Sequence, residues 1–164
     1  AMEEGSFYES LVFMKSNDLN IIIIVENNSW SLGTKIDERR CEIDLSKLTN
    51  SIGIEYFSLN GNNPIDYVQQ VRSHRTKSLE NNTPVLIEVQ LTTLGHWNMK
   101  TEEYPAGKFI NYHAGPAPEV EIEKYPLISN SNEDPLFVLK QYFSERELMD
   151  ISSKILKQLE SELL

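Results

Sequence analysis

The stretch over residues 3–34 decides the fold, and it reads EEGSFYESLVFMKSNDLNIIIIVENNSWSLGT. Within it, Ile21–Val25 are five consecutive apolar residues, and this run predicts a strand over residues 21–26. A continuous apolar run is typical of a strand buried on both faces of a parallel sheet covered by helices. In such sheets, ligands bind at the carboxyl ends of the strands, where Asn27 and Asn28 stand. The sequence therefore points to a site at residues 26–30.

The segment before this strand predicts a helix over residues 6–17. Ser6 is the candidate N-cap, and Glu9 follows at the spacing of a capping box. The apolar side chains recur at spacings of four and three, which places them on one helical face: Phe7, Leu11 and Met14. A helix followed at once by a buried strand is the first step of an α/β arrangement.

The rest of the first half alternates helices and strands. The segment from Asp44 predicts a short helix that ends near Gly53, and a strand is predicted over residues 54–59. A helix is expected to begin at Pro64, with a rough apolar stripe of Ile65, Val68, Val71 and Leu79. A third strand is expected over residues 84–91. A helix between successive strands is typical of parallel crossover connections, so the predicted fold class is α/β, a parallel sheet with flanking helices.

The pattern is lost between Thr92 and Asp134. Five of the seven prolines lie at or beyond Pro105, and long irregular segments of this kind are usually functional loops or wrap a partner. A second capping-box spacing at residues 144–147 then predicts a C-terminal helix. Its apolar stripe is expected to pack on its own domain rather than on a partner subunit: Leu148, Ile151, Ile155, Leu159 and Leu163. The predicted parts are an α/β cofactor-binding core over 1–92, an irregular active-site or partner loop over 93–134, and a helical segment over 135–164.

Composition excludes several classes of protein. The chain has 164 residues, a net charge of −10 and no basic stripe, which argues against a nucleic-acid partner. No apolar run approaches the roughly 18 residues of a membrane span, so no membrane association is expected. The single cysteine, Cys41, excludes an intrachain disulfide and fits a cytoplasmic protein. We expect Cys41 to be an inert thiol at or near the surface.

Residue chemistry suggests a metal and phosphate site near Asn28. Mg²⁺ prefers oxygen ligands, including amide and backbone carbonyls, and usually shares them with phosphate. An asparagine at a strand end, followed by an irregular loop, can supply both kinds of oxygen. The start of the first helix, at residues 1–5, has free backbone N–H groups that could hold a phosphate.

These residues resemble the thiamine diphosphate motif of 2-oxo acid dehydrogenase alpha subunits (pyruvate, branched-chain and acetoin dehydrogenase type), in their C-terminal part. That motif has Gly-Asp-Gly, a spacer of just under thirty residues and then Asn-Asn. Residues 83–88 and Gly95-His96 also look like the family's G-P-x-L-x-E…GH segment. The matches at the start of the chain are spread over residues 1–34: Ala1, Glu4, Gly5, Phe7, Glu9, Glu26, Asn27, Asn28, Ser29, Trp30, Gly33 and Thr34.

The resemblance implies a thiamine diphosphate-binding fold, incomplete in this chain, and a set of site residues. Asn28 would be a side-chain ligand of Mg²⁺, and Trp30 would offer its backbone carbonyl to the same ion. The backbone amides of Ala1 and Met2 would contact the diphosphate. His96 would lie on a loop that closes over the cofactor, in a catalytic and cofactor-binding position. Of the other histidines, His74 is expected to be solvated on its helix, and His113 has no assigned role.

The sequence also departs from the family pattern. The Gly-Asp-Gly that supplies the metal carboxylate would lie just before residue 1. The Tyr-Arg pair usual before Gly-His is Leu91-Thr92 here, and the serine usual after it is Trp97. Residues 98–125 match none of the motif segments quoted above. These departures leave the substrate open.

The implied function is part of an enzyme that uses thiamine diphosphate and Mg²⁺ to decarboxylate a 2-oxo acid oxidatively and passes the acyl group to a lipoyl carrier protein. The implied partner is a beta subunit in a heterotetramer, or further copies in a homo-oligomer, and the chain alone is expected to be inactive. One alternative is a non-catalytic remnant or interaction domain of the same fold, and another is the N-terminal part of a transketolase-like enzyme. We also expect an exposed sheet edge that favours dimerisation.

Overall fold

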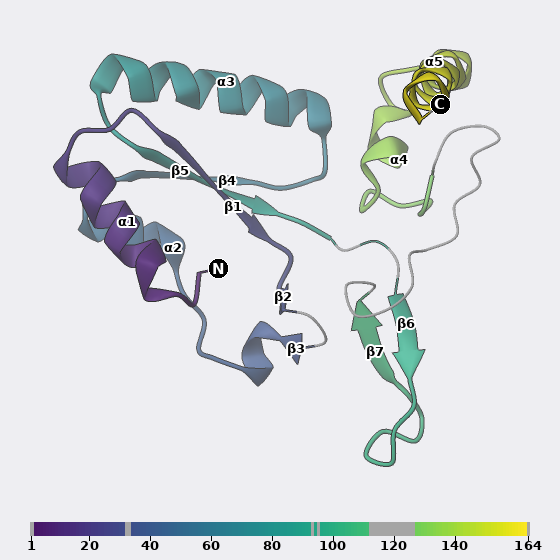
Figure 1. The fold of residues 1–164 in the computed structure, drawn as a ribbon, viewed down its shortest axis with the longest axis horizontal. Helices are drawn as coiled ribbons and strands as arrows, with labels where there is room; N and C mark the ends of the chain where they lie inside the picture. The colour runs from purple at the N-terminus through teal and green to yellow at the C-terminus, as the bar shows by residue number, and fades with distance from the viewer. Residues whose placement is uncertain (1, 32–33, 93, 95, 112–126, 164) are drawn as a thin grey trace. The chain divides into compact units, whose positions relative to one another are not determined.

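The computed structural model describes residues 2–31, 34–92, 94, 96–111 and 127–163, and Figure 1 shows their secondary structure. The chain divides into two compact units. The first unit comprises residues 1–29, 35–60 and 65–91, and the second comprises residues 30–34, 61–64 and 92–164. The three-part division expected from the sequence stays a prediction.

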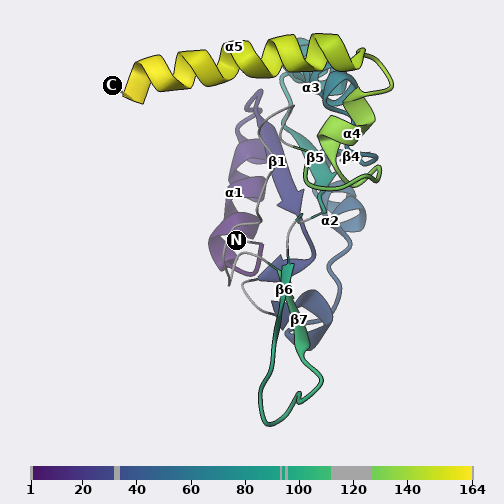
Figure 2. The same ribbon diagram turned by 90° about the vertical axis from the view of Figure 1, so that its right-hand side faces the viewer.

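The centre of the first unit is a parallel sheet of three strands in the order β1-β5-β4. The strands are β1 (Ile22–Asn27), β5 (Val85–Gln90) and β4 (Glu55–Leu59). Helices α1 (Gly5–Ser16) and α2 (Leu45–Ser51) lie on one face and α3 (Pro64–Asn81) on the other, as Figures 1 and 2 show. This arrangement confirms the predicted α/β class.

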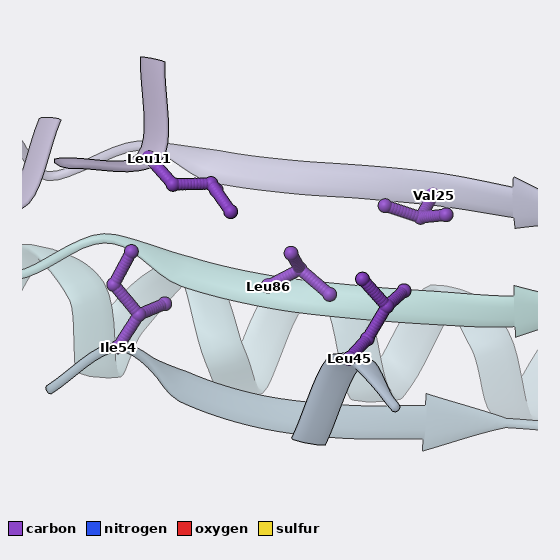
Figure 3. Close-up of a cluster of buried hydrophobic side chains, with 5 residues drawn as sticks. All are labelled: Leu11, Val25, Leu45, Ile54 and Leu86. Atoms are coloured by element: carbon purple, nitrogen blue, oxygen red, sulfur yellow. The ribbon is translucent and has the colours of Figure 1, made fainter. Parts of the chain in front are cut away.

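The face under α1 and α2 carries a cluster of fully or nearly fully buried apolar side chains. Figure 3 shows them converging from both helices and the sheet: Leu11, Val25, Leu45, Ile54 and Leu86. Phe7 packs against this cluster, so the predicted apolar face of the first helix is the one that is buried. Asp44 caps α2 by accepting the Lys47 N–H at 2.9 Å, which confirms the helix expected from the sequence.

The opposite face packs on α3, and here the predicted stripe is partly wrong. Val68 and Leu79 are about half exposed, at 49% and 47%. The residues that α3 turns to the sheet are Tyr67, Val71, His74 and Ser78. His74 is only 5% exposed and stacks on Phe57 with ring centroids 3.5 Å apart, so the expected solvated histidine is a buried one. His74 therefore occupies an inward-facing position of α3 at which the apolar stripe predicts an aliphatic side chain.

The two-face burial expected of β1 belongs to β5 instead. The five residues from Val85 to Val89 are all buried, because β5 is the central strand with a neighbour on each side. β1 is the edge strand of the described sheet, and Ile24 is 52% exposed on the side of α3. The expected exposed sheet edge is therefore present in the structure, and the dimerisation it favours stays a prediction.

The first helix begins one residue earlier than predicted. Glu4 is the N-cap residue, with no side-chain capping bond, and the Phe7 N–H donates to the Glu4 carbonyl at 3.0 Å. The predicted N-cap role of Ser6 is therefore wrong, because Ser6 already lies inside the first turn. Boundaries of this kind shift easily by one residue when no side chain caps the helix.

The second unit contains short elements and the C-terminal helix. β2 (Trp30–Ser31) pairs with β3 (Thr34–Lys35), and β6 (His96–Met99) pairs antiparallel with β7 (Lys108–Asn111). The segment over 93–134, which is expected to be irregular, thus contains a two-stranded ribbon. Strands as short as β6 and β7 give too few residues for an alternating pattern to be recognised in the sequence. Asp134 caps α4 (Pro135–Leu139) by accepting the Leu136 N–H at 2.8 Å.

The helix α5 (Glu145–Leu163) starts with the predicted capping box. The Glu147 N–H donates to Ser144 Oγ at 3.4 Å, and the Ser144 N–H donates to Glu147 Oε2 at 2.9 Å. The Ser144 hydroxyl also donates to Glu147 Oε2, at 2.7 Å, and this bond together with the one from the Ser144 N–H holds the pKa of the Glu147 carboxyl below its usual value. Of the predicted stripe, Leu148 is buried, whereas Ile151, Ile155 and Leu159 are about half exposed. The expectation that the whole stripe packs on its own domain is therefore wrong in the described structure.

Candidate cofactor-binding site

The candidate site begins where β1 ends. Asn27 is the last residue of β1, and the Leu91 N–H donates to the Asn27 carbonyl at 2.9 Å. This bond continues the pairing of β1 with β5 to the carboxyl edge of the sheet. Asn28 follows directly and is half-buried. The position fits the rule that α/β sheets bind ligands at this edge.

Ser29 turns the chain at this point. Its φ of 61° lies in the left-handed region, which a residue with a side chain adopts at a cost in free energy. Two hydrogen bonds hold it there. Asn27 Oδ1 accepts the Ser29 N–H at 3.0 Å, and the Ser29 carbonyl accepts the Ile36 N–H at 3.2 Å. The loop after β1 therefore has a defined backbone course up to Ser29.

A buried carboxylate supports this turn from the neighbouring strand. Glu88 of β5 is 7% exposed, and its Oε1 accepts a hydrogen bond from Asn27 Nδ2 at 2.7 Å. Its Oε2 accepts one from the Tyr56 hydroxyl of β4 at 2.6 Å. Both carboxylate oxygens thus have a partner, which a buried charged group requires.

The Tyr56 hydroxyl stays protonated and can therefore donate its hydrogen bond to Glu88 over a wide range of pH. Burial, together with its hydrogen bond to Glu88, raises the pKa of Tyr56 from 10.0 to about 12. Tyr56 therefore keeps its proton at any physiological pH. The three side chains Asn27, Glu88 and Tyr56 span all three strands of the sheet.

The start of the chain is tied to the segment that follows the loop. Arg39 Nη1 lies 2.6 Å from Glu3 Oε1, and Arg40 Nε lies 2.9 Å from the same oxygen. Hydrogen bonds from Arg40 and Arg39 hold the pKa of the Glu3 carboxyl below its usual value. Because Ile36 bonds to Ser29, these contacts link the segment before α1 to the loop after β1.

The predicted site residues are placed as follows. Met2 packs against the first core cluster, and its carbonyl accepts the Tyr8 hydroxyl at 2.9 Å. Trp30 begins β2, two residues after Asn28 in the sequence. His96 begins β6, where its backbone pairs with that of Asn111. Ala1 and His113 lie outside the described residues. The structure thus gives each described residue a position, while its role at the site stays a prediction.

The donor chemistry fits part of a magnesium site. Asn28 offers an amide oxygen and Trp30 a backbone carbonyl, which are the hard oxygen donors that Mg²⁺ takes. In the part of the chain that the structure describes, no three acidic, histidine or cysteine side chains group as a metal site. Two such donors can supply part of the coordination of an ion that also takes phosphate oxygens.

Two hollows in the first unit lie away from Asn28. One, of about 220 Å³, is lined by Phe57, Asn60, Asp66 and His74 among others, and is smaller than the usual ligand pocket. The buried Nδ1 of His74 has no hydrogen-bond partner in the described structure, and burial lowers the pKa of its ring. The other, of about 430 Å³, lies by α2 and the amino end of β4, opposite to the edge at which such sheets bind ligands.

Sequence reasoning assigned no role to Glu88, Tyr56 or the Arg39–Arg40 pair. Glu88 could have been found, because a single charged residue inside the apolar run Val85–Val89 must have a partner if the strand is buried. Tyr56 and the Arg39–Arg40 pair have no comparable signal in the sequence. Their partners depend on the strand register and on a contact between residues far apart in the sequence.

The chain is similar in sequence to known proteins of one family. The family model for the dehydrogenase E1 component matches residues 1–105. The pyruvate dehydrogenase E1 component subunit alpha of Rickettsia bellii is 27% identical over 156 residues, which cover 94% of this chain and 44% of that protein. The 2-oxoisovalerate dehydrogenase subunit alpha 1 of Arabidopsis thaliana is 28% identical over 111 residues, 66% of this chain and 24% of that protein.

A third relative is the 2-oxoisovalerate dehydrogenase subunit alpha of Bacillus subtilis, 27% identical over 85 residues, 52% of this chain and 26% of that protein. The chain thus spans less than half the length of these relatives. None of the described helices is long and apolar enough to cross a membrane. On the match over residues 1–105 and its similarity to these alpha subunits, the chain belongs to the dehydrogenase E1 component family.

Proposed function

We propose that the protein forms part of a thiamine diphosphate- and Mg²⁺-dependent 2-oxo acid dehydrogenase, on the alpha-subunit side of its decarboxylating component. The observation that carries the proposal is the position of Asn28, directly after a parallel strand at the carboxyl edge of the sheet and next to a braced turn at Ser29. Family membership supports it. Bound thiamine diphosphate supplies the electron sink for the loss of CO₂ from a 2-oxo acid.

In this proposal, each residue of the chain has a binding or orienting task. Asn28 and the Trp30 carbonyl hold Mg²⁺. The backbone amides of Ala1 and Met2, before the positive end of α1, bind the diphosphate. His96 lies near the substrate and excludes water when its segment closes.

The proposed partners follow from the division of labour in the family. A beta subunit supplies the glutamate that activates the aminopyrimidine of the cofactor, and a lipoyl carrier protein receives the acyl group. A heterotetramer, or a homo-oligomer, would bring these groups together. We also propose a cytoplasmic location, which the single cysteine supports, since Cys41 is exposed and free.

The test is ion-dependent cofactor binding by the protein purified with the subunits it assembles with. Calorimetry with thiamine diphosphate is expected to show binding that requires Mg²⁺, and Asn28→Ala is expected to weaken Mg²⁺ binding by about tenfold or more. The matched control is Asn17→Ala. Asn17 is an exposed asparagine after α1 whose Nδ2 donates to the Phe13 carbonyl at 2.8 Å, and its variant should bind like the wild type.

A second candidate is a non-catalytic interaction domain that keeps the fold. The Leu91-Thr92 pair in place of Tyr-Arg favours it. The same calorimetry separates the two. A purified assembly that shows no thiamine diphosphate binding with or without Mg²⁺ would contradict the enzymatic proposal and support the interaction domain. A panel of 2-oxo acids, beginning with pyruvate and 2-oxoisovalerate, then identifies the substrate of an active assembly.

A further inference from the structure

We infer that Glu88 is a positioning residue for the proposed magnesium loop: its carboxylate orients the Asn27 amide, and that amide holds Ser29 in the conformation from which the loop continues to Trp30. The inference rests on the proposed function, because it concerns the same ion site. It adds residues of β4 and β5 to a site that is otherwise confined to the loop after β1.

The first step is the orientation of the Asn27 side chain. An amide has one donor end and one acceptor end, so a carboxylate beside it selects the donor end. Glu88 Oε1 accepts from Asn27 Nδ2 at 2.7 Å, which turns Asn27 Oδ1 away from the carboxylate. The opposite orientation would place two oxygens against each other at a site that is largely closed to water, since Glu88 is 7% exposed.

The second step is the turn that this orientation supports. Asn27 Oδ1, directed away from Glu88, accepts the Ser29 N–H at 3.0 Å. An asparagine that accepts the N–H two residues on forms a local turn, which offsets the cost of the left-handed φ of 61° at Ser29. Asn28 lies inside this turn and Trp30 directly follows it, so both proposed ligands depend on its backbone course.

The third step is the anchoring of Glu88 itself. Its other oxygen accepts the Tyr56 hydroxyl at 2.6 Å, so the carboxylate is held from β4 as well as from β1. Residues that orient metal ligands from outside the ligand set commonly change metal affinity by about 10–100-fold when mutated. Glu88 and Tyr56 are placed for this task by neighbouring strands of the parallel sheet, β5 and β4.

The test uses variants that break the contact between Glu88 and Asn27 while preserving the packing. Glu88→Leu alone removes the acceptor of the half-buried Tyr56 hydroxyl, so the main variant is the double substitution Glu88→Leu with Tyr56→Phe. Replacing both partners by apolar groups of similar shape costs little stability. Glu88→Gln is the conservative variant, because its amide oxygen can still accept from Asn27. Val85→Ala is the control, since Val85 is fully buried in the same strand and belongs to the cluster on the other face.

Two readouts are measured on these proteins. Amide hydrogen exchange of Ser29, followed by NMR on the full chain without cofactor, reports the turn. The double variant and Asn27→Ala are expected to raise this exchange rate about tenfold, as the loss of one hydrogen bond would. Mn²⁺ binding in the presence of thiamine diphosphate, followed by electron paramagnetic resonance on the purified assembly, reports the ion site. The double variant is expected to weaken it about tenfold or more. Glu88→Gln should restore both values to near wild type, and Val85→Ala should leave Mn²⁺ affinity unchanged.

The outcomes separate the inference from the proposal on which it rests. If Asn28→Ala abolishes Mn²⁺ binding but the double variant binds Mn²⁺ like the wild type, the positioning role of Glu88 is wrong and the proposed function stands. If Glu88→Gln fails as badly as the double variant, orientation of the Asn27 amide is not the cause, and the inference is also overturned. If the wild-type assembly binds neither Mn²⁺ nor thiamine diphosphate, the proposed function itself is wrong, whatever Ser29 exchange shows.

Discussion

The exposure of β1 on the α3 side leads to a sharp prediction about two adjacent isoleucines. Ile23 packs against the cluster under α1 and α2, whereas Ile24 is 52% exposed on the other face. Substitution of each by alanine removes the same atoms from the same strand. Because about half of the Ile24 side chain is already in water, Ile24→Ala should lower the free energy of unfolding by only about 1 kcal/mol. Ile23→Ala should cost about 2 kcal/mol, and Leu86→Ala, from a site with 0% exposure, about 3–4 kcal/mol.

The assay is urea unfolding of the full chain followed by circular dichroism, with the midpoint and the m-value fitted separately. An unchanged m-value ensures that the shift reports stability rather than a change in the unfolded state. A loss for Ile24→Ala as large as that for Leu86→Ala would refute the assignment of β1 as an edge strand with one open side. The same comparison in the purified assembly tests the predicted association. If another chain or segment covers the edge there, the cost of Ile24→Ala should rise to about that of a buried isoleucine, roughly 2–3 kcal/mol.

Three further predictions concern the polar side chains Tyr56, His74 and Asp134. Because the pKa of Tyr56 is raised to about 12, the unfolded chain releases this proton first, so stability should fall as pH rises from 10.0 towards 12. Tyr56→Phe should show less of this loss in urea midpoints measured from pH 9 to pH 11. Burial lowers the pKa of His74, so as the pH falls the unfolded chain takes up this proton before the folded chain does, and stability should fall below pH 6.5. The urea midpoint of His74→Gln should depend less on pH in this range. A midpoint that falls as steeply as that of the wild type would contradict the prediction. Asp134 accepts the N–H groups of Ile128, Ser129 and Leu136 at 2.7–2.9 Å, so Asp134→Ala should destabilise the second unit by about 3 kcal/mol and Asp134→Asn by less, as measured by thermal unfolding.

The parts of the fold that the sequence predicts well are those in which local pattern and packing agree. The strand predicted over 54–59 is one residue longer than β4 (Glu55–Leu59), and the strand predicted over 84–91 is one residue longer at each end than β5 (Val85–Gln90). The short helix after Asp44 has its predicted cap. In each of these places an apolar run is bounded by a proline, a glycine or a capping side chain, so the local sequence determines the type of the element and places the limits of both strands to within one residue.

The sequence predicts burial less well than it predicts elements, because burial depends on where a strand lies in the sheet. The run Ile21–Val25 and the run Val85–Val89 look alike in sequence, yet only the second is covered on both sides. The same limit applies to α3. Its inward face includes His74 and Ser78, where Ser78 Oγ donates to the Thr83 carbonyl at 2.8 Å, and a stripe drawn through aliphatic residues misses both. Strand order and tertiary hydrogen bonds, rather than periodicity, decide these positions.

The candidate site also depends on tertiary contacts that the sequence pattern does not predict. Position within the sequence suffices to single out Asn28, because any residue just after a parallel strand lies at the binding edge. The support behind it depends on register. Glu88 pairs across the sheet with Val25 on β1 and with Ser58 on β4. Its hydrogen-bond partners, Asn27 and Tyr56, are the diagonal neighbours two residues further along one strand and two residues back on the other.

A shift of one residue in either pairing would turn these side chains to opposite faces and separate them. The register that brings Asn27 to Glu88 is itself fixed by packing, because the same register places Val25 and Leu86 in the cluster under α1 and α2. A substitution in that cluster that kept the fold but altered the register would therefore change the loop at Asn28 without touching it. Core packing of this sheet and the geometry of the proposed ion site are consequences of one and the same pairing.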